Sequence, residues 1–233
     1  MDKQVNVLSG GAAAAVVKGV QAGFERETGC RINGIFSAVG QMRDQLLAGA
    51  PCDLVILTQP LVAQLIASGH VAEGTARSLG RVATGVAVKA GHEHPPLGNR
   101  EELAAALRSA TGIYFPDPEQ ATAGIHFMNV LKALGLDQEL RAALRSYPNG
   151  ASAMAAMAGS SEPHLIGCTQ VTEINYTAGV ELVAPLPDEF ELVTDYTLGI
   201  CTQAREPRLA QQLAALLTGP ASAAVRRQGG FEF

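Results

Sequence analysis

The chain has 233 residues, of which 47% are apolar and 17% charged, so it can bury a full core as one α/β domain or as two small lobes. Its formal net charge is -5 and it contains no run of Lys or Arg, which argues against a nucleic acid or an acidic membrane surface as a partner. No apolar segment is long enough to span a bilayer, so we expect no membrane insertion.

The cysteines are spread along the chain without any CxxC spacing, which argues against a zinc site. We interpret them as small, reduced core residues, and we expect neither a metal nor a cofactor. They are Cys30, Cys52, Cys168 and Cys201.

The first predicted strand ends in a glycine turn. Residues 5–8 are mostly apolar, the run stops at Ser9, Gly10 and Gly11, and an alanine-rich helix is predicted over 12–28. The first amides of a helix are unpaired and carry partial positive charge, and glycines let a ligand approach the backbone. An anion can therefore bind here without Lys or Arg. The same order also builds an ordinary α/β turn, so the pattern alone leaves both interpretations open.

Two more strand ends follow the same pattern. A strand over 31–36 leads through Ser37 and Gln41 into a helix over 42–48. A continuous apolar strand over 52–58 ends at Thr58, before a helix over 61–68. The three strand ends can share the carboxyl edge of a parallel sheet, where ligands of open α/β folds bind. We therefore expect Ser37, Gln41 and Thr58 to be ligand-binding residues.

The middle of the chain repeats the alternation. The predicted elements are a strand over 81–89, a helix over 101–109, a strand over 112–115 and a helix over 125–134. His92 and His94 lie in a proline-rich loop with no third ligand nearby, which favours a solvated turn over a metal site. In the loop over 116–124, acidic and hydroxyl side chains can cap the next helix, and small residues leave its start accessible.

The rest of the chain is predicted to alternate as well. The elements are helices over 137–145 and 151–158, strands over 164–170, 180–183 and 190–201, and helices over 209–217 and 221–228.

Several stretches resemble the periplasmic molybdate-binding proteins, which are class II solute receptors of ABC transporters, and the resemblance covers nearly the whole chain. The matching stretches are 24–29 (FERETG), 47–54 (LAGAPCDL), 117–119 with 123–125, 131–135, and 217–220 (LTGP). The resemblance implies an α/β protein with the two-lobed class II periplasmic-binding-protein fold, in which two mixed sheets are flanked by helices and a cleft lies between the lobes. Residues 1–80 and 196–233 would form lobe 1, and residues 81–195 would form lobe 2, joined to it by two hinge strands.

The family's site is not carried over intact. Two positions that bear serine hydroxyls in the family are Ala12 and Val39 here, and the family's cleft tyrosine aligns with Gln170. The alanine whose amide reaches the oxyanion is kept as Ala123, preceded by Thr122. Each donor lost from a buried charged ligand costs about 1.5–3 kcal/mol, which argues against molybdate. We expect Thr122, Ala123 and Gln170 to bind a small carboxylate, and Arg81 either to clamp it or to form a surface ion pair.

Two functions follow from the resemblance. The first is the binding of a small, oxygen-rich anion, a carboxylate rather than molybdate, in the cleft. The alternative is a cofactor-independent double-bond isomerase acting on an unsaturated di- or tricarboxylate, since the family also includes aconitate isomerase-like members. The candidate bases for proton transfer are His126, Asp117, Glu119 and Glu173, and each also has a structural interpretation as a packed, surface or capping residue.

No export signal precedes the first strand, so we expect a cytoplasmic location as the chain is written. A periplasmic location and an ABC transporter as partner are expected only if a leader has been removed.

Overall fold

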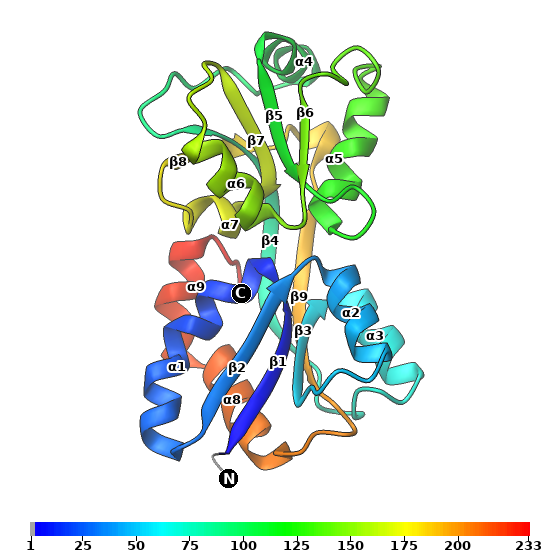
Figure 1. The fold of residues 1–233 in the computed structure, drawn as a ribbon, viewed down its shortest axis with the longest axis vertical. Coiled ribbons are helices and arrows are strands. Elements are labelled where there is room, and N and C mark those ends of the chain that lie inside the picture. Colours follow the sequence, from blue (N-terminus) through cyan, green and yellow to red (C-terminus); the bar gives the residue numbers. More distant parts are fainter. Residues whose placement is uncertain (1–2) are drawn as a thin grey trace. The chain divides into compact units, whose positions relative to one another are not determined.

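The computed structural model describes residues 3–233 and divides the chain into two compact units (Figure 1). The first unit is Met1–Val82 with Thr194–Phe233, and the second is Ala83–Val193. The chain leaves the first unit within β4 (Arg77–Lys89) and returns to it at the start of β9 (Val193–Ile200). The unit boundaries therefore lie two residues from those that the sequence predicts.

The first unit is built on the strand order β2-β1-β3-β9. β1 (Gln4–Gly10) pairs in parallel with β2 (Arg31–Ser37) and with β3 (Leu54–Thr58), and β9 runs antiparallel to β3. β3 is buried along its whole length, as expected of an apolar strand that is covered on both faces.

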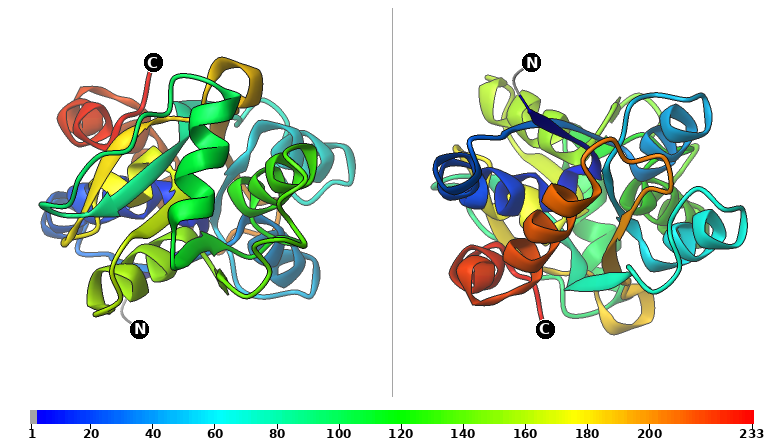
Figure 2. Two further views of the ribbon diagram at one scale, coloured as in Figure 1. Left: turned by 90° about the horizontal axis from the view of Figure 1, so that it is seen from above. Right: turned by 90° about the horizontal axis from the view of Figure 1, so that it is seen from below.

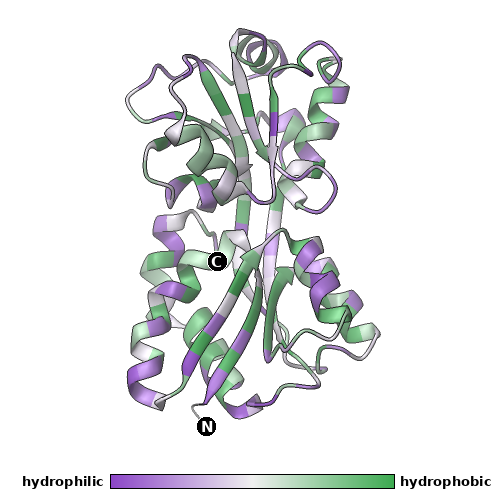
Figure 3. Cartoon of the chain, viewed as in Figure 1, coloured by the Kyte–Doolittle hydropathy of each residue, from purple (hydrophilic) through white to green (hydrophobic). Residues whose placement is uncertain are grey.

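Helices cover both faces of this sheet (Figure 2, right). They are η1 (Gly11–Ala13), α1 (Ala14–Thr28), α2 (Val39–Leu47), α3 (Gln59–Ala67), α8 (Pro207–Thr218), η3 (Pro220–Ser222) and α9 (Ala223–Gly229). In Figure 3, α1 and α2 alternate between polar and apolar colours along their length, because only one face of each helix packs on the sheet. The apolar residues that predict α1 from their spacing, among them Val16, Val20 and Phe24, are its buried ones.

A buried aspartate ties the first unit together. Asp53 is 1% exposed, and its Oδ2 accepts hydrogen bonds from the backbone N (2.7 Å) and Nδ2 (3.0 Å) of Asn6. Its Oδ1 accepts from the backbone amides of Arg205 (2.6 Å) and Glu206 (3.0 Å). One carboxylate thus fastens β1 and the start of α8 to the residues just before β3.

The second unit has the strand order β8-β4-β7-β5-β6. β5 (Gly112–Pro116), β6 (Leu144–Tyr147) and β7 (Leu165–Gln170) are parallel, whereas β8 (Val180–Pro185) and β7 are antiparallel to β4. The helices are α4 (Arg100–Ser109), α5 (Thr122–Ala133), α6 (Gly150–Gly159), α7 (Val171–Asn175) and η2 (Asp188–Phe190).

Alternate residues of β5 pack into two different cores. Ile113 and Phe115 belong to a cluster that also contains apolar residues of α4 and α5, including Phe127. Tyr114 belongs to a second cluster, with Met154 and other residues of α6. Figure 2 (left) shows α5 and α6 on opposite sides of this sheet. The sheet is therefore covered on both faces, which explains the apolar strands of the second unit.

Three details differ from the sequence prediction. The predicted helix over 137–145 is wrong, because turns occupy this segment and Leu144 begins the parallel pairing of β6 with Ile113 of β5. The helix α7 was not predicted. The helices α2 and α5 begin at Val39 and Thr122, each three residues before its predicted start, so Gln41 and Ala123 lie in first helical turns rather than in loops.

All four cysteines are buried and free of disulfide bonds. Within residues 3–233, no helix combines the length and the hydrophobicity that crossing a membrane requires. In the same part of the chain, no group of three or more His, Cys, Asp or Glu side chains is arranged to hold a metal ion.

Candidate functional site

Three parallel strands of the first unit end side by side. Gly10, at the end of β1, pairs in register with Ser37, at the end of β2. Thr58 ends β3, the other neighbour of β1, and lies opposite Tyr196 of β9. Three of the predicted ligand-binding positions, Gly10, Ser37 and Thr58, therefore share one edge of the sheet.

Each of these strands runs directly into a helix whose start has no side-chain cap. The residues that precede η1, α2 and α3 are Gly10, Ala38 and Thr58, and none of their side chains accepts a hydrogen bond from the helix. Asp and Glu are also absent from the first turns of these helices. The first amides of a helix have no partner within the helix. This edge therefore concentrates N–H donors and the positive ends of the α2 and α3 dipoles.

Gly10 is required where it stands. A Cβ added at this residue would lie 2.7 Å from Cγ1 of Val39 and 3.0 Å from Cε1 of Tyr196. Val39 and Tyr196 thus approach the backbone at the end of β1 from two sides. Tyr196 was missed by the sequence reasoning, because its place beside Gly10 depends on the antiparallel pairing of β9 with β3.

Two other predicted residues of the first unit are engaged in other interactions. Ser9 is fully buried, and its hydroxyl donates to the carbonyl oxygen of Gly10 (2.9 Å). Arg81 is exposed and lies 3.5 Å from the carboxylate of Glu232, the surface ion pair that was its alternative interpretation. Gly11 is half-buried in η1, and Gln41 is exposed in the first turn of α2.

The second unit has its own strand-end positions. The α5 helix begins after Ala121 without a side-chain cap, so the amides of Thr122 and Ala123 lie at an open helix start. Gly124 is pressed against its own loop, because a Cβ there would lie 2.3 Å from the carbonyl oxygen of Pro116.

Gln170 ends β7, the parallel neighbour of β5, and is 2% exposed. It lies opposite Thr84 of β4. The hydroxyls of Thr84 and Thr172 are buried and have no hydrogen-bond partner among the described residues. A buried hydroxyl without a partner is costly, so two of them beside Gln170 indicate a place for a polar guest or for water.

Glu173 belongs to α7, and its buried carboxylate lies against the start of α6, where it accepts several hydrogen bonds. Its Oε2 accepts from Oγ1 of Thr169 (2.5 Å), and the carboxylate also accepts from the amides of Gly150, Ala151 and Gln170. Burial raises the pKa of this carboxyl, and the hydrogen bonds oppose part of the rise. The first amides of α6 are therefore occupied by a carboxylate of the protein itself.

The other three candidate bases have different environments. Oδ1 of Asp117 accepts from the amides of Glu119 (2.7 Å) and Gln120 (2.9 Å), which closes a turn. The acidic and hydroxyl side chains of this loop, Asp117, Glu119 and Thr122, were predicted to cap the next helix. That prediction is wrong, since α5 has no side-chain cap. Nε2 of His126 lies 2.7 Å from the carbonyl oxygen of Phe190. Glu119 is exposed.

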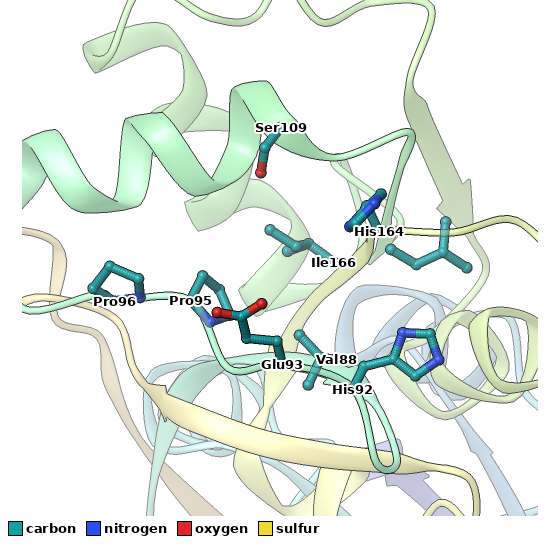
Figure 4. Close-up of a pocket in the computed structure, with 9 residues that line it drawn as sticks. Val88, His92, Glu93, Pro95, Pro96, Ser109, His164 and Ile166 are labelled. Carbon is teal, nitrogen blue, oxygen red and sulfur yellow. The ribbon is translucent and has the colours of Figure 1, made fainter.

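A cavity of about 300 Å³ lies in the second unit, away from these positions (Figure 4). It is lined by Val88, His92, Glu93, Pro95, Pro96, Ser109, His164, Leu165 and Ile166. Leu165 begins β7 and Gln170 ends it, so the strand rise separates the two residues by roughly 17 Å. The residues predicted to bind a ligand do not line this cavity.

The chain belongs to the bacterial extracellular solute-binding proteins, since the model of that family matches residues 5–232. It is similar to the periplasmic molybdate-binding protein of Azotobacter vinelandii, with a TM-score of 0.80, 18% identity, and coverage of 98% of this chain and 99% of the other. It also resembles the sulfate-binding protein of Mycobacterium tuberculosis, with a TM-score of 0.72, 14% identity, and coverage of 98% and 86%.

A curated relative is an aconitate isomerase of a Pseudomonas species, 24% identical over 98% of this chain and 87% of the relative. The two-lobed class II solute-binding fold that the sequence resemblance implied is confirmed. A small solute is accordingly the ligand class of the family, and the cytoplasmic location stays a prediction.

Proposed function

We propose that the protein binds a small anion bearing carboxylate groups, and that the strand ends supply its hydrogen-bond donors. In the first unit the donors are the amides at the starts of η1, α2 and α3 and the side chains of Ser37, Gln41 and Thr58. The second unit has a set of like groups of its own, which are the amides of Thr122 and Ala123 and the side chain of Gln170. Ser9 and Arg81 are not part of the proposal, because their polar groups are engaged within the protein.

The observation that carries the proposal is the row of uncapped helix starts in the first unit. Three neighbouring strands end in Gly10, Ser37 and Thr58, and the helices that follow have neither a capping side chain nor an acidic residue in the first turn. Natural helices that bind no anion commonly satisfy these amides with Ser, Thr, Asp or Asn at the N-cap. Three such starts at one sheet edge favour an anionic guest over a neutral one.

A carboxylate is favoured over a tetrahedral oxyanion by the side chains at this edge. Val39 and Gly10 offer no hydroxyl, and the hydroxyl of Ser9 is turned to the backbone. The donors that remain include Gln41 and Gln170, whose long amide side chains reach further than serine. Long amide side chains suit an extended guest with two or more carboxylates better than a compact molybdate or sulfate.

A thermal-shift screen tests this proposal. Di- and tricarboxylates, molybdate, tungstate and sulfate are added to the full chain one at a time. A specific ligand at a hundred times its dissociation constant should add about 2.7 kcal/mol to the free energy of unfolding. We expect this gain from at least one carboxylate; a gain from molybdate alone would contradict the proposal.

Matched variants locate the site. Ser37→Ala and Gln41→Ala should each weaken the binding of the carboxylate that stabilises the protein in the screen. We expect a loss of affinity of roughly 10-fold or more, because each variant removes a hydrogen bond to a charged group. Gln64→Ala serves as the control, since Gln64 is exposed in α3 away from its first turn. Equal affinities for all four proteins, measured by titration calorimetry, would rule out this edge as the site.

A second candidate function is supported by the aconitate isomerase relative. A double-bond isomerase needs a base near the acidic carbon of its substrate and donors for the enolate-like intermediate. The uncapped amides could serve as these donors. We propose Glu119 as the first base to test, because it is exposed, whereas Asp117, His126 and Glu173 hydrogen-bond within the protein.

Proton NMR separates the two functions. Each carboxylate that stabilises the protein is incubated with it in D2O, and a moved double bond or deuterium uptake identifies an isomerase. A loss of this activity in Glu119→Gln with unchanged affinity would support the assigned base. An unchanged ligand would leave binding as the function.

A further inference from the structure

Two of the four cysteines meet in the first unit, far apart in sequence. Cys52 lies just before β3, and Cys201 follows directly after β9. The backbone amide of Cys201 donates to the carbonyl oxygen of Asp53 (3.0 Å), which continues the antiparallel pairing of the two strands. This register places Cys201 opposite Asp53, the residue that follows Cys52, so the two cysteines are neighbours across the strand pair, one residue out of register.

The two thiols also contact each other. The Cys201 and Cys52 side chains are hydrogen-bonded, and Sγ of Cys52 donates to the carbonyl oxygen of Leu54 (3.3 Å).

Both sulfur-bearing residues line a cavity of about 220 Å³. His70 and Arg205 line it too, together with Leu46, Leu47 and several small or polar residues. Cys52 is 8% exposed and Cys201 is 4% exposed, whereas Cys30 and Cys168 are fully buried. A small oxidant therefore has a path to this pair that it lacks to the other two thiols.

We propose that Cys52 and Cys201 form a redox-active dithiol that a hydroperoxide converts into an intramolecular disulfide. Sγ of Cys52 attacks one peroxide oxygen and loses its proton, the O–O bond breaks, and the leaving oxygen takes up that proton as water or an alcohol, so that Cys52 becomes a sulfenic acid. Sγ of Cys201 then attacks the Cys52 sulfur, the S–O bond breaks, and a second water leaves with the Cys201 proton. In sum, two thiols supply two electrons to one peroxide.

The order of these steps follows from the exposure of the two thiols. The hydrogen bond with Cys52, together with burial and the charge of Asp53, raises the pKa of the Cys201 thiol. Cys52 is the more exposed of the two thiols (8% against 4%), so a peroxide in the cavity reaches it first and Cys201 acts second, as the resolving thiol. Its hydrogen bond also places it against the sulfur that it must attack.

The disulfide would close a loop that contains residues 53–200, including the whole second unit. Cross-links that close long loops restrict the unfolded chain strongly. Cys52 lies before β3 and Cys201 after β9, whereas Thr58 and its partner Tyr196 lie at the other end of this strand pair. We therefore expect the disulfide to stabilise the protein without blocking the ligand-binding edge.

Intact-mass spectrometry of the full chain, treated with one equivalent of hydrogen peroxide and then alkylated, tests the proposal. We expect a mass loss of about 2 Da, two thiols protected from alkylation, and a cross-linked peptide pair containing Cys52 and Cys201. The melting temperature should rise by about 5–10 °C on oxidation and should fall back to its starting value when dithiothreitol reduces the disulfide. Cys168→Ala, the matched control, should behave like the unmodified protein.

Single variants test the order of the two thiols. Cys201→Ser should accumulate a sulfenic acid on Cys52 that dimedone labels, and Cys52→Ser should give no label at Cys201. Oxygen addition without a 2 Da loss, a disulfide to another cysteine, or two free thiols after treatment of the unmodified protein would each overturn the proposal. These outcomes need only the unmodified chain, so a variant that fails to fold leaves the test intact.

Discussion

Glu173 shows how one side chain can decide whether a helix start is open or closed. The first two amides of α6, those of Gly150 and Ala151, donate to its carboxylate, and the next, that of Ser152, donates to Oδ1 of Asn149 (2.9 Å). The starts of η1, α2 and α3 lack such partners. Among strand-end helices of the same general build, only the uncapped ones can take an external anion.

The raised pKa of Glu173 makes a prediction about pH. A carboxyl whose pKa is higher in the folded protein than in the unfolded chain favours folding when protonated, so its contribution is full below about pH 4.5. This contribution is lost as the pH rises through the folded pKa. We therefore expect the free energy of unfolding of the unmodified protein, relative to that of Glu173→Gln, to fall as the pH rises from 4 to 8. Urea unfolding of both proteins measures it.

The replacement also changes hydrogen bonding, because the glutamine NH₂ cannot accept from the α6 amides. That cost does not depend on pH, so the slope of the difference, rather than its size, tests the raised pKa. A flat difference between pH 4 and pH 8 would contradict it. Asp44→Asn, which removes an exposed carboxylate on α2, is the control for the loss of one acidic side chain.

At the scale of the element, α6 is fitted to its surroundings by small residues at its start. A Cβ on Gly150 would lie 1.9 Å from Oε2 of Glu173 and 2.0 Å from Oγ1 of Thr169. The helix also packs closely on β7, since a Cβ on Gly167 would lie 2.5 Å from Cε of Met154. Packing thus requires a small residue at the start of α6 and, at the second contact, a glycine on β7 opposite Met154 of α6.

Gly150→Ala should destabilise the protein by about 1–3 kcal/mol, because the new methyl group collides with a held carboxylate and hydroxyl. Gly159→Ala is the matched control, at the other end of the same helix, where no atom lies within 4 Å of the added Cβ. It should change stability by less than about 1 kcal/mol. Chemical denaturation measures both, and equal effects would contradict the packing argument.

At the scale of the whole molecule, the second unit is one continuous segment inserted into the first. The backbone amide of Thr84 donates to the carbonyl oxygen of Leu192 (2.9 Å), so the segment enters and leaves at one place. Its sheet carries a core on each face, formed within residues 83–193. The first unit, by contrast, needs both chain ends, since β9 completes its sheet.

Residues 83–193 should therefore fold when expressed alone. We expect a cooperative urea transition in circular dichroism, as is usual for single domains of this size. Phe127→Ala in this fragment should cost about 3–5 kcal/mol, since Phe127 is fully buried in the core against Phe115. A fragment without a cooperative transition would show that its two cores depend on the first unit.

The sequence alone determined most of the strands and helices, but not β6 and α7, together with the glycine turns at the strand ends and the family resemblance, because these depend on residue spacing within short windows. It failed over residues 137–145, where turns replace the predicted helix and the last two residues already pair with β5 as the start of β6. It also placed the starts of α2 and α5 three residues late, since neither helix has a capping residue to mark its start.

Only the tertiary structure decided which polar groups are already used. It placed the Glu173 carboxylate on the α6 amides, the Ser9 hydroxyl on the Gly10 carbonyl, and Tyr196 beside Gly10. The contact between Cys52 and Cys201 likewise joins residues far apart in the chain. Each of these contacts depends on strand register and on elements distant in sequence, and local residue patterns carry no information about the register between such elements.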